Sequence, residues 1–449
     1  MTLRHIRRKS LAAGAVLSLA LLAACSGGGS DDTTTSAGGD CSAAAEGEKV
    51  TLTFSSWVPG MQKTVDLWNK QNPNIQVQYK EVAAGARGTY QTYANQIKAG
   101  NTDDLGMVEF DSLPSFRMQD GLANIGACPG VAQTAAQYVP WTMKQVAFGE
   151  PGAVYGVPQD VGPLALYYRK DLFEKSGIAV PATWDEFYDA AKQVKANGGL
   201  ITNFPPDAAN YFAALAWQNG ANWFSNSGSA WTVSMTDDKT KQVADYWQRM
   251  ITEKLVDSTP ALTDTQFKAL ETDRQWSVIG AAWTAKLIEN GSPGTAGKWG
   301  VVPLPQWQAG QQVSGNWGGS TTVVFKNSKH PAEAAKFAFW AFGNLEALAL
   351  NNANGGQFPA TTAGETDLPA LTQPYPYFGD QVIWKTFQEA AAQVDEAWQW
   401  GPTMTQTFTD LADGLSDAIN GQGTVLDAVT EAQQKTITTM KSQAIQVTE

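Results

Sequence analysis

Histidine and cysteine are scarce in this sequence. Its 449 residues include two histidines, His5 and His330, and three cysteines. A Ser/His/Asp triad would have to use His330, because His5 lies in the N-terminal export segment, so we expect no such triad. One remaining histidine and unclustered cysteines do not have the ligand spacing of a metal site. We therefore predict no metal site, no cofactor and no catalytic residue of these kinds.

Long hydrophobic runs are also lacking. Outside the first 25 residues, no stretch approaches the roughly 18 apolar residues of a membrane span. The apolar run at 11–22 is too short to span a bilayer, follows a basic stretch at 4–9 and precedes the small residues Ala23 and Ala24. This order is typical of a signal peptide, which is removed from the mature chain.

Cys25 ends the signal peptide in a motif, Leu22-Ala23-Ala24-Cys25, that resembles the bacterial lipobox. The lipobox cysteine becomes the lipidated first residue of the mature protein; ordinary cleavage with an incidental cysteine is the alternative. The Gly/Ser/Asp/Thr-rich tract at 26–40 favours lipidation because it is typical of a flexible tether. Stable anchoring takes more than one acyl chain, so a multiply acylated Cys25 would hold the protein at a membrane surface.

Basic residues are outnumbered by acidic ones. The chain has 31 Lys+Arg and 43 Asp+Glu, and its net charge of −12 becomes −16 without the four basic residues of the signal peptide. Such a surface repels phosphates, so we expect no nucleic acid or other polyanionic partner. In an oxidising location Cys41 and Cys128 could form one disulfide that ties the tether to the first lobe, or stay unpaired, because sequence alone does not fix the distance between them.

The composition and the length predict a globular protein with at least two lobes. Apolar residues make up 43% of the chain and charged residues 16%, and single hydrophobic cores stop growing beyond roughly 250–300 residues. Strand and helix signals alternate in the first part of the chain, which indicates a mostly parallel α/β lobe whose ligands lie beyond the carboxyl ends of its strands. The predicted strands there are 50–56, 75–79 and 105–110, and the predicted helices are 61–70 and 90–99.

The later chain continues to mix helices and strands. A capping box at Thr183-Trp184-Asp185-Glu186 starts a helix. Further helices are predicted at 208–218, 239–253, 331–342 and over much of 383–448, and strands at 276–282 and 321–325.

Three stretches resemble one family. The run YGVPQDVGPLALYYRKDLFEKSGIAVPATWDEFYDAAKQV (155–194) resembles the signature of the family 1 extracellular solute-binding proteins, the carbohydrate-binding components of ABC importers. VVPLP (301–305) with GGSTTVVFKNSKHPAEAAKFAFW (318–340), and GQFPA (356–360), are similar to two further stretches of that family. The resemblance covers the chain from about residue 48.

The resemblance implies a two-lobe fold of the periplasmic-binding-protein type II, with hinge crossings and a ligand cleft between the lobes. Closure of the lobes would present the ligand to a membrane permease. The expected organisation is a signal peptide at 1–25, a tether at 26–47, a discontinuous lobe at 48–160 plus 318–378, and a second at 161–317 plus 379–449.

The tryptophans are the first candidates for a sugar site, because an indole face matches the C–H face of a pyranose. The chain has 17 of them. Trp68, Trp184 and Trp340 lie at core spacing on helices, and we assign them to packing. The candidates for ligand binding lie in loops next to predicted strands or, for Trp217, beside the Asn219-Gly220 loop; they are Trp57, Trp217, Trp283 and Trp317.

Acidic, amide and glycine positions complete the predicted site. Asp111 follows a predicted strand and is either a ligand group or a turn residue. Asp160 lies in the family-like signature at the first crossing, and we expect its carboxylate to accept hydrogen bonds from sugar hydroxyls. Gly318 and Gly319 would let the backbone approach the ligand, and Gln357 is a candidate amide.

These observations predict an extracytoplasmic, monomeric, non-enzymatic protein that captures a sugar or oligosaccharide and passes it to ABC transporter permease subunits. It would be held on the outer face of the bacterial cytoplasmic membrane by the lipid on Cys25 alone. Two alternatives stay open: the same fold binding a peptide, polyamine or polyol, and a secreted carbohydrate-cleaving enzyme that uses paired carboxylates.

Overall fold

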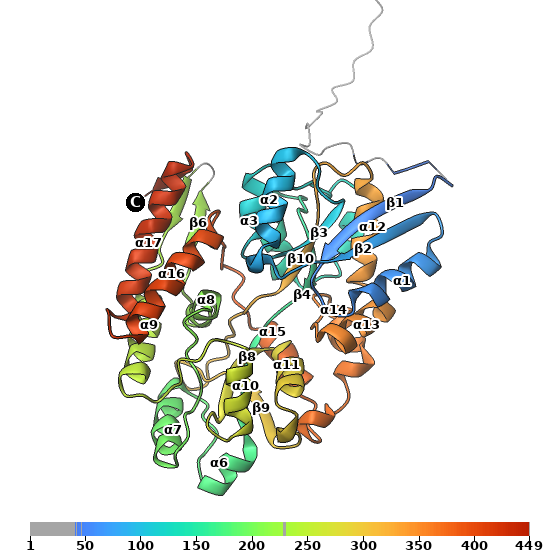
Figure 1. The fold of residues 1–449 in the computed structure, drawn as a ribbon. Helices are drawn as coiled ribbons and strands as arrows, with labels where there is room; N and C mark the ends of the chain where they lie inside the picture. The colour runs from blue at the N-terminus through green and yellow to red at the C-terminus, as the bar shows by residue number, and fades with distance from the viewer. Residues whose placement is uncertain (1–40, 42, 46, 228–229, 449) are drawn as a thin grey trace, which may run out of the picture. The chain divides into compact units, whose positions relative to one another are not determined.

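A five-stranded sheet is the core of the first part of the chain. The computed structural model describes residues 41, 43–45, 47–227 and 230–448 (Figure 1). The strand order is β2-β1-β3-β10-β4. β1 is parallel to β2 and β3, whereas β10 is antiparallel to β3 and β4. The strands are β1 (Val50–Ser56), β2 (Ile75–Glu81), β3 (Leu105–Glu109), β4 (Val157–Asp160) and β10 (Ser320–Val324).

The central strands form where apolar side chains bury completely. Leu52 and Phe54 on β1 have no exposed surface, and β10 is buried along its whole length. Burial on both faces suits a central strand. The polar residues that β10 buries include Thr321, whose hydroxyl donates to Val108 O at 2.8 Å. The predicted parallel arrangement is confirmed for β1, β2 and β3, while β10 comes from a segment more than 150 residues after β4.

Helices cover this sheet to make what we call lobe 1. Helix α1 packs against α12 and α13, and the indole of Trp68 lies 5.2 Å from that of Trp340, so the packing role predicted for these two residues is confirmed. The helices of lobe 1 are α1 (Met61–Gln71), α2 (Thr89–Ala99), α3 (Leu113–Met118), α4 (Val131–Ala135), α5 (Pro140–Ala147), α12 (Pro331–Ala341), α13 (Leu345–Gly355) and α14 (Thr362–Asp367).

Two smaller sheets form the rest, which we call lobe 2. In the first sheet β5 (Leu164–Arg169) pairs antiparallel with both β8 (Ser277–Ala281) and β9 (Trp299–Pro303), and α15 packs against it. The second sheet has the order β11-β7-β6 and contains β6 (Phe224–Ser227), β7 (Ala230–Val233) and β11 (Gln446–Thr448). These three strands were not predicted, because each has only three or four residues and β11 depends on the chain folding back onto β7.

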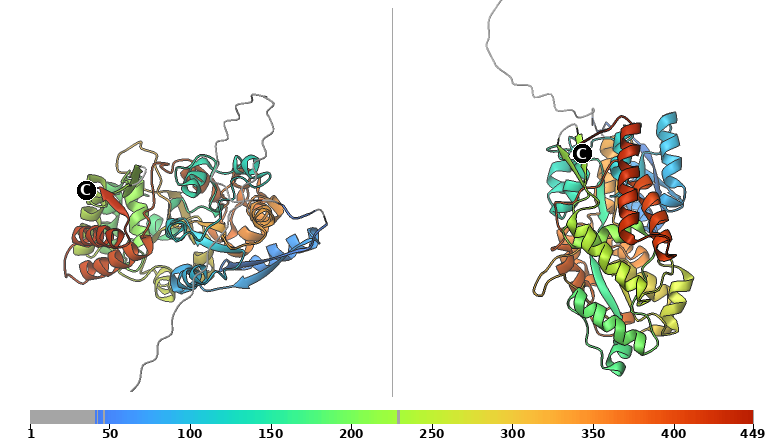
Figure 2. Two further views of the ribbon diagram at one scale, coloured as in Figure 1. Left: turned by 90° about the horizontal axis from the view of Figure 1, so that it is seen from above. Right: turned by 90° about the vertical axis from the view of Figure 1, so that its left-hand side faces the viewer.

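Helices α8, α9, α16 and α17 pack together beside the β11-β7-β6 sheet (Figures 1 and 2). The predicted capping box of α7 is confirmed, since the Thr183 side chain accepts from Glu186 N and the Glu186 side chain accepts from the backbone of Thr183. The helices of lobe 2 are α6 (Lys170–Ser176), α7 (Trp184–Ala196), α8 (Ala209–Gln218), α9 (Asp238–Thr252), α10 (Asp264–Glu271), α11 (Thr284–Gly291), α15 (Trp384–Ala391), α16 (Met404–Ile419) and α17 (Val425–Ser442).

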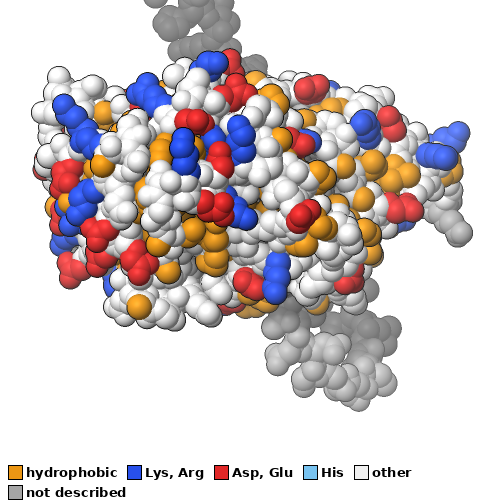
Figure 3. Space-filling model, turned by 90° about the horizontal axis from the view of Figure 1, so that it is seen from below, with side chains coloured by type: hydrophobic (Ala, Val, Ile, Leu, Met, Phe, Trp, Pro, Cys, Tyr) orange, Lys and Arg blue, Asp and Glu red, His pale blue; other side chains and the backbone are white. Residues whose placement is uncertain are grey.

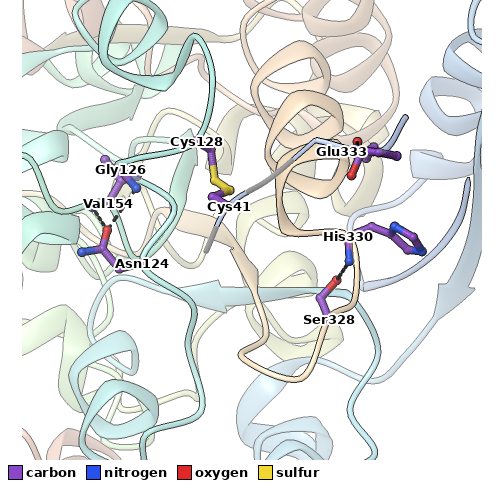
Figure 4. The surroundings of a disulfide bond; sticks show 9 residues. Cys41, Asn124, Gly126, Cys128, Val154, Ser328, His330 and Glu333 are labelled. Atoms are coloured by element: carbon purple, nitrogen blue, oxygen red, sulfur yellow. Dashed lines mark hydrogen bonds between the residues drawn. A yellow bond between two sulfur atoms is a disulfide. The ribbon is translucent and has the colours of Figure 1, made fainter. Parts of the chain in front are cut away.

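A disulfide joins Cys41 and Cys128, with their Cα atoms 5.1 Å apart (Figure 4). It ties the first described residues to the loop that follows Ile125. Close by, Asn124 Oδ1 accepts from the backbone N–H groups of Gly126 and Val154. The backbone N–H of Ala44 donates to Glu333 at 2.6 Å, which adds a contact with α12.

Replacing both Cys41 and Cys128 by serine should lower the free energy of unfolding by roughly 2–5 kcal/mol, because the cross-link constrains an unfolded loop with a sequence separation of 87. Chemical denaturation with and without a reducing agent measures this loss. A reductant-sensitive midpoint in the parent protein and an insensitive one in the double variant are expected; equal midpoints in all four samples would contradict a stabilising disulfide.

Candidate functional site

Two extended segments run from one lobe to the other and form hydrogen bonds to each other; we call this place the crossing. The segment between β4 and β5 runs antiparallel to the segment that precedes β10. Trp317 N donates to Gly162 O at 2.8 Å, and Leu164 N donates to Gly315 O at 3.1 Å. A Cβ atom at Gly162 would lie 2.0 Å from Trp317 O, so this close pairing requires glycine.

The Asn316 side chain reinforces the crossing. Its Oδ1 accepts from Gly162 N at 2.7 Å, and its Nδ2 donates to Gly318 O at 2.8 Å. A third segment joins the crossing where Val161 N donates to Phe358 O at 3.0 Å. The crossing therefore joins three segments that are far apart in the sequence. Each segment lies in or near one of the three motifs of the family resemblance.

Asp160 lies at the end of β4, and its carboxylate is already bonded to the protein. Oδ1 accepts from both the backbone N–H and the hydroxyl of Ser320, at 3.0 and 2.9 Å. Burial raises the pKa of Asp160 to about 6, and the hydrogen bonds from Ser320 oppose that rise. The side chain is 6% exposed, so it links β4 to β10, and its contact with a ligand stays a prediction.

Gln357 lies close to Asp160 in the interior. Its Nε2 donates to Gln159 Oε1 at 3.3 Å, while its Oε1 is buried with no hydrogen-bond partner. An acceptor of this kind costs roughly 1–3 kcal/mol if it stays unpaired. The amide therefore has one oxygen free for a further donor.

Two of the predicted tryptophans lie against each other at the crossing. The rings of Trp283 and Trp317 are 5.0 Å apart, and Trp283 Nε1 donates to Trp317 O at 3.2 Å. Trp317 is 6% exposed and donates through Nε1 to Asn210 Oδ1 at 3.0 Å, whereas Trp283 is half-buried. Trp283 is thus the member of the pair with an accessible surface.

Gly318 and Gly319 follow Trp317 with positive φ angles of 72° and 85°. A side chain is strained in this backbone region. A Cβ atom at Gly318 would approach Trp283 Nε1 to 3.6 Å, and one at Gly319 would lie 3.0 Å from Asp160 O. Gly318 therefore lies beside the Trp283 indole, and Gly319 lies against Asp160 O and the Phe110 ring.

A pocket of about 540 Å³ opens between the two lobes. From lobe 1 it is lined at the end of β3 and at the start of α2 and α3; from lobe 2 it is lined at the start of α8 and along α16. Its lining residues include Tyr90, Glu109, Asp111, Ser112, Asp207, Asn210, Thr405, Phe408 and Asp413.

Two of the predicted tryptophans, Trp57 and Trp317, adjoin this pocket through residues that line it. Trp57, which is half-buried directly after β1, packs its ring edge-on at 5.9 Å from that of Tyr90. Trp317 reaches the lining through its hydrogen bond to Asn210. The structure thus brings Asp111, Trp57, Trp317 and Trp283 into one neighbourhood that both lobes share.

Trp217 lies elsewhere. Its indole is 1% exposed, stacks on Trp398 at 5.1 Å and meets Trp141 edge-on at 5.8 Å. Its Nε1 donates to Asp395 O at 2.9 Å. The structure therefore buries Trp217 in an aromatic cluster between α5, α8 and the segment before α16, and does not join it to the pocket.

The two carboxylates at the end of β3, those of Glu109 and Asp111, are the acids that line the pocket from lobe 1. Tyr90 donates its hydroxyl to Glu109 at 2.8 Å, and Ser112 donates its hydroxyl to Asp111 Oδ1 at 2.8 Å. Burial, followed by repulsion from Glu109, raises the pKa of Asp111 to about 8; burial also raises the pKa of Glu109. Asp111 is therefore more than a turn residue: it is a buried acid facing a pocket.

Several lining residues were missed from the sequence. Glu109 carried a usable signal, because side chains two apart on a strand share a face and Asp111 was already a candidate. Tyr90, Asn210 and the lining residues of α16 carried none, since their approach to β3 is set by the contact between lobes.

Other predicted features lie outside the site or outside the described residues. Cys25 belongs to the part of the chain that the structure does not describe. Within the described ranges, no group of three His, Cys, Asp or Glu side chains could hold a metal ion, and no helix is long and apolar enough to cross a membrane.

Comparison with known proteins gives a family and several relatives. Residues 53–345 match the family model described as bacterial extracellular solute-binding protein. The lactose-binding protein of Rhizobium radiobacter is 27% identical over 252 residues, which cover 54% of this chain and 58% of that protein. The arabinooligosaccharide-binding protein of Bacillus subtilis is 25% identical over 290 residues, covering 62% and 65%. The matched parts span less than two thirds of these relatives.

Solved structures match over more of the chain. The galacto-N-biose-/lacto-N-biose I-binding protein of the ABC transporter from Bifidobacterium longum, in complex with lacto-N-biose, has a TM-score of 0.80 and 28% identity over 90% of this chain and all of that one. The ABC transporter associated binding protein from B. animalis subsp. lactis, in complex with β-1,6-galactobiose, has a TM-score of 0.77, 25% identity and the same coverage. The predicted two-lobe α/β fold is confirmed.

Asp111→Asn should flatten the pH dependence of stability. The folded protein holds a proton on Asp111 up to about pH 8, whereas the unfolded chain releases it near the ordinary value of 3.8, so the stability that this group contributes is lost as the pH rises between these values. Melting temperatures from about pH 5 to pH 9 should fall more steeply for the parent than for the variant. The matched control is Asp185→Asn, on the exposed start of α7; identical slopes for the parent and Asp111→Asn would contradict the raised pKa.

Proposed function

The chain belongs to the bacterial extracellular solute-binding protein family, and from this premise we propose that it binds a sugar or oligosaccharide between its lobes and delivers it to an ABC transporter permease. The observation that carries the proposal is the pocket between lobes, where indole rings adjoin carboxylate, amide and hydroxyl groups. The sugar-binding names of the matched relatives and the bound disaccharides of the two solved structures support it.

The chemistry of the pocket suits a sugar. A pyranose offers a C–H face that packs on an aromatic ring, and hydroxyls that need planar donors and acceptors. Tyr90 and Phe408 line the pocket with rings, and Asp111 and Asn210 supply oxygens. Trp57 lies against Tyr90, and the half-buried Trp283 lies against Trp317, so we propose that a sugar larger than one unit reaches these rings as well. Hydrogen bonds to charged groups contribute roughly 1.5–3 kcal/mol each, so a few of them with one or two stacked rings account for the roughly −8 kcal/mol of micromolar binding.

Our proposed site keeps most of the residues predicted from the sequence and adds others from the pocket lining. It retains Trp57, Asp111, Trp283 and Trp317, with Gly318 and Gly319 as the backbone beneath the ring, and adds Glu109, Tyr90 and Asn210. Asp160 and Gln357 are buried beside the crossing, and we propose that they contact a ligand that binds at Gly319. Trp217 is left out because its ring is enclosed by other aromatic side chains.

Binding would close the lobes about the crossing. A ligand shifts the equilibrium toward the closed form only through contacts that differ between the two forms. The pocket fits this requirement because its walls come from both lobes. We propose the lobe boundaries 48–160 plus 318–378 and 161–317 plus 379–449, and a monomer that binds its ligand without chemical change.

The lipid anchor is a further part of the proposal. The lipobox-like motif and the tether at 26–40 support a lipidated Cys25 on the outer face of the cytoplasmic membrane. With an anchor at Cys25, the folded part of the protein would be held at the membrane that contains the permease.

A panel of neutral oligosaccharides tests the function. Lactose, lacto-N-biose, β-1,6-galactobiose, arabino-oligosaccharides and malto-oligosaccharides are titrated by calorimetry, with a peptide, a polyamine and a polyol as comparison. At least one sugar should bind with a micromolar or lower Kd and be recovered intact. Binding of the polyamine alone, or shortened sugars, would favour the rival functions.

Trp283→Ala should weaken binding of that sugar by at least about tenfold, the equivalent of roughly 1.4 kcal/mol, because it removes an accessible ring. Trp231→Ala is the matched control, since Trp231 is also half-buried but lies on β7, which does not line the pocket. Equal losses in the two variants, or none in Trp283→Ala, would remove the indole from the proposed site.

Cys25→Ser should release the protein from membranes. In a bacterial host the parent should fractionate with membranes and incorporate radiolabelled palmitate, because one diacylated residue supplies the anchor. The variant should lose the label and appear in the soluble extracytoplasmic fraction. A variant that stays membrane-bound without label would contradict the lipid as the sole anchor.

A further inference from the structure

The charges that line the pocket are all of one sign. Among its lining residues are four acids, Glu109, Asp111, Asp207 and Asp413, and no lysine, arginine or histidine. On the face of the molecule seen in Figure 3, by contrast, acidic and basic side chains are interspersed. The concentration of acids without a basic residue is therefore a local feature of the pocket walls.

Glu109 and Asp111 lack a cationic partner in the described part of the chain. Neither forms one of its ion pairs, and the side-chain donors that they receive are the neutral hydroxyls of Tyr90 and Ser112. Asp111 is 6% exposed, and a buried carboxylate without a counter-ion is costly. Burial raises the pKa of both acids, repulsion from Glu109 adds to the rise for Asp111, and none of the ion pairs among the described residues opposes it.

The groups facing these acids from lobe 2 do not supply the charge. Asp207 accepts from the backbone N–H of Ala261 at 3.1 Å and adds a further negative group. Lys435 on α17 interacts electrostatically with Asp413 but forms an ion pair with Glu431 at 2.8 Å, and it is not part of the lining. The positive charge would have to come from a ligand.

The aromatic part of the pocket is compatible with a cation. Tyr90 hydrogen-bonds Glu109 and packs edge-on against Trp57. Ammonium groups bind favourably beside such rings, and more so where water is displaced. A protonated amine placed here would therefore meet carboxylates and rings together.

We propose that the pocket sorts oligosaccharides by charge: it binds acidic sugars least tightly, neutral ones more tightly, and those that carry a protonated amino group most tightly. This inference rests on the proposed function and names the substrate class of the same site. A protonated amine would lower the pKa of Asp111 and pair with its carboxylate. A carboxylate or sulfate offers this acid no counter-ion and would lie among acids from both lobes, which is unfavourable.

Three matched probes test the sorting. They are lactose, lactose with the primary hydroxyl of its galactose unit replaced by an amine, and lactose with that group oxidised to a carboxylate; if another panel sugar binds instead, the same three forms of that sugar are used. Calorimetry near neutral pH should give a Kd at least about threefold lower for the amine and about tenfold higher for the carboxylate than for the neutral sugar.

The variant Asp111→Asn tests whether the preference for charge arises in the pocket. The amide cannot ionise to pair with the amine, so the ratio between the Kd of the carboxylate and that of the amine should narrow by about threefold, whatever affinity for the neutral sugar is lost. Asp185→Asn removes one exposed acid from α7, outside the pocket, and should leave the ratio unchanged. A ratio that falls equally in both variants would show that net charge, and not the pocket, sorts the ligands.

The outcomes separate this inference from the function on which it rests. If no neutral sugar of the panel binds, the proposed function fails. If a neutral sugar binds but its three forms agree within about threefold, or the carboxylate binds most tightly, the function stands and the charge sorting is wrong.

Discussion

The backbone pairing at the crossing is the constraint on which the site depends. Because Gly162 has no side chain, the Trp317 carbonyl and N–H can pack against this segment, and Asn316 closes the arrangement with two further hydrogen bonds. The pairing fixes Trp317, whose carbonyl accepts the indole N–H of Trp283.

The second constraint on the site is the burial of its carboxyl groups. At the crossing, Asp160 is held by the Ser320 N–H and hydroxyl, so its carboxylate is supported by the protein itself. At the end of β3, Asp111 and Glu109 have only neutral donors. The donors of all three acids are neutral, and all three acids belong to the sheet of lobe 1 or adjoin it, but only Asp111 and Glu109 line the pocket.

Much of the fold could be predicted from local patterns, and the site only in part. Alternation predicted β1, the stretch at 321–325 predicted β10, and the capping box predicted the start of α7. A loop position next to a strand singled out Trp283, and a position beside the Asn219-Gly220 loop added Trp217, because the sequence does not show that Trp398 stacks on Trp217. Likewise the α16 wall of the pocket depends on long-range packing that no local pattern encodes.

The central claim is that one sugar is held by both lobes at once. Hydrogen exchange of backbone amides, measured with and without the sugar that binds most tightly in the panel, tests it most directly. Protection should appear together at 109–112 in lobe 1, at 207–210 and 405–416 in lobe 2, and at 317–319 in the crossing. Protection confined to one lobe, or located away from all of these segments, would contradict the account.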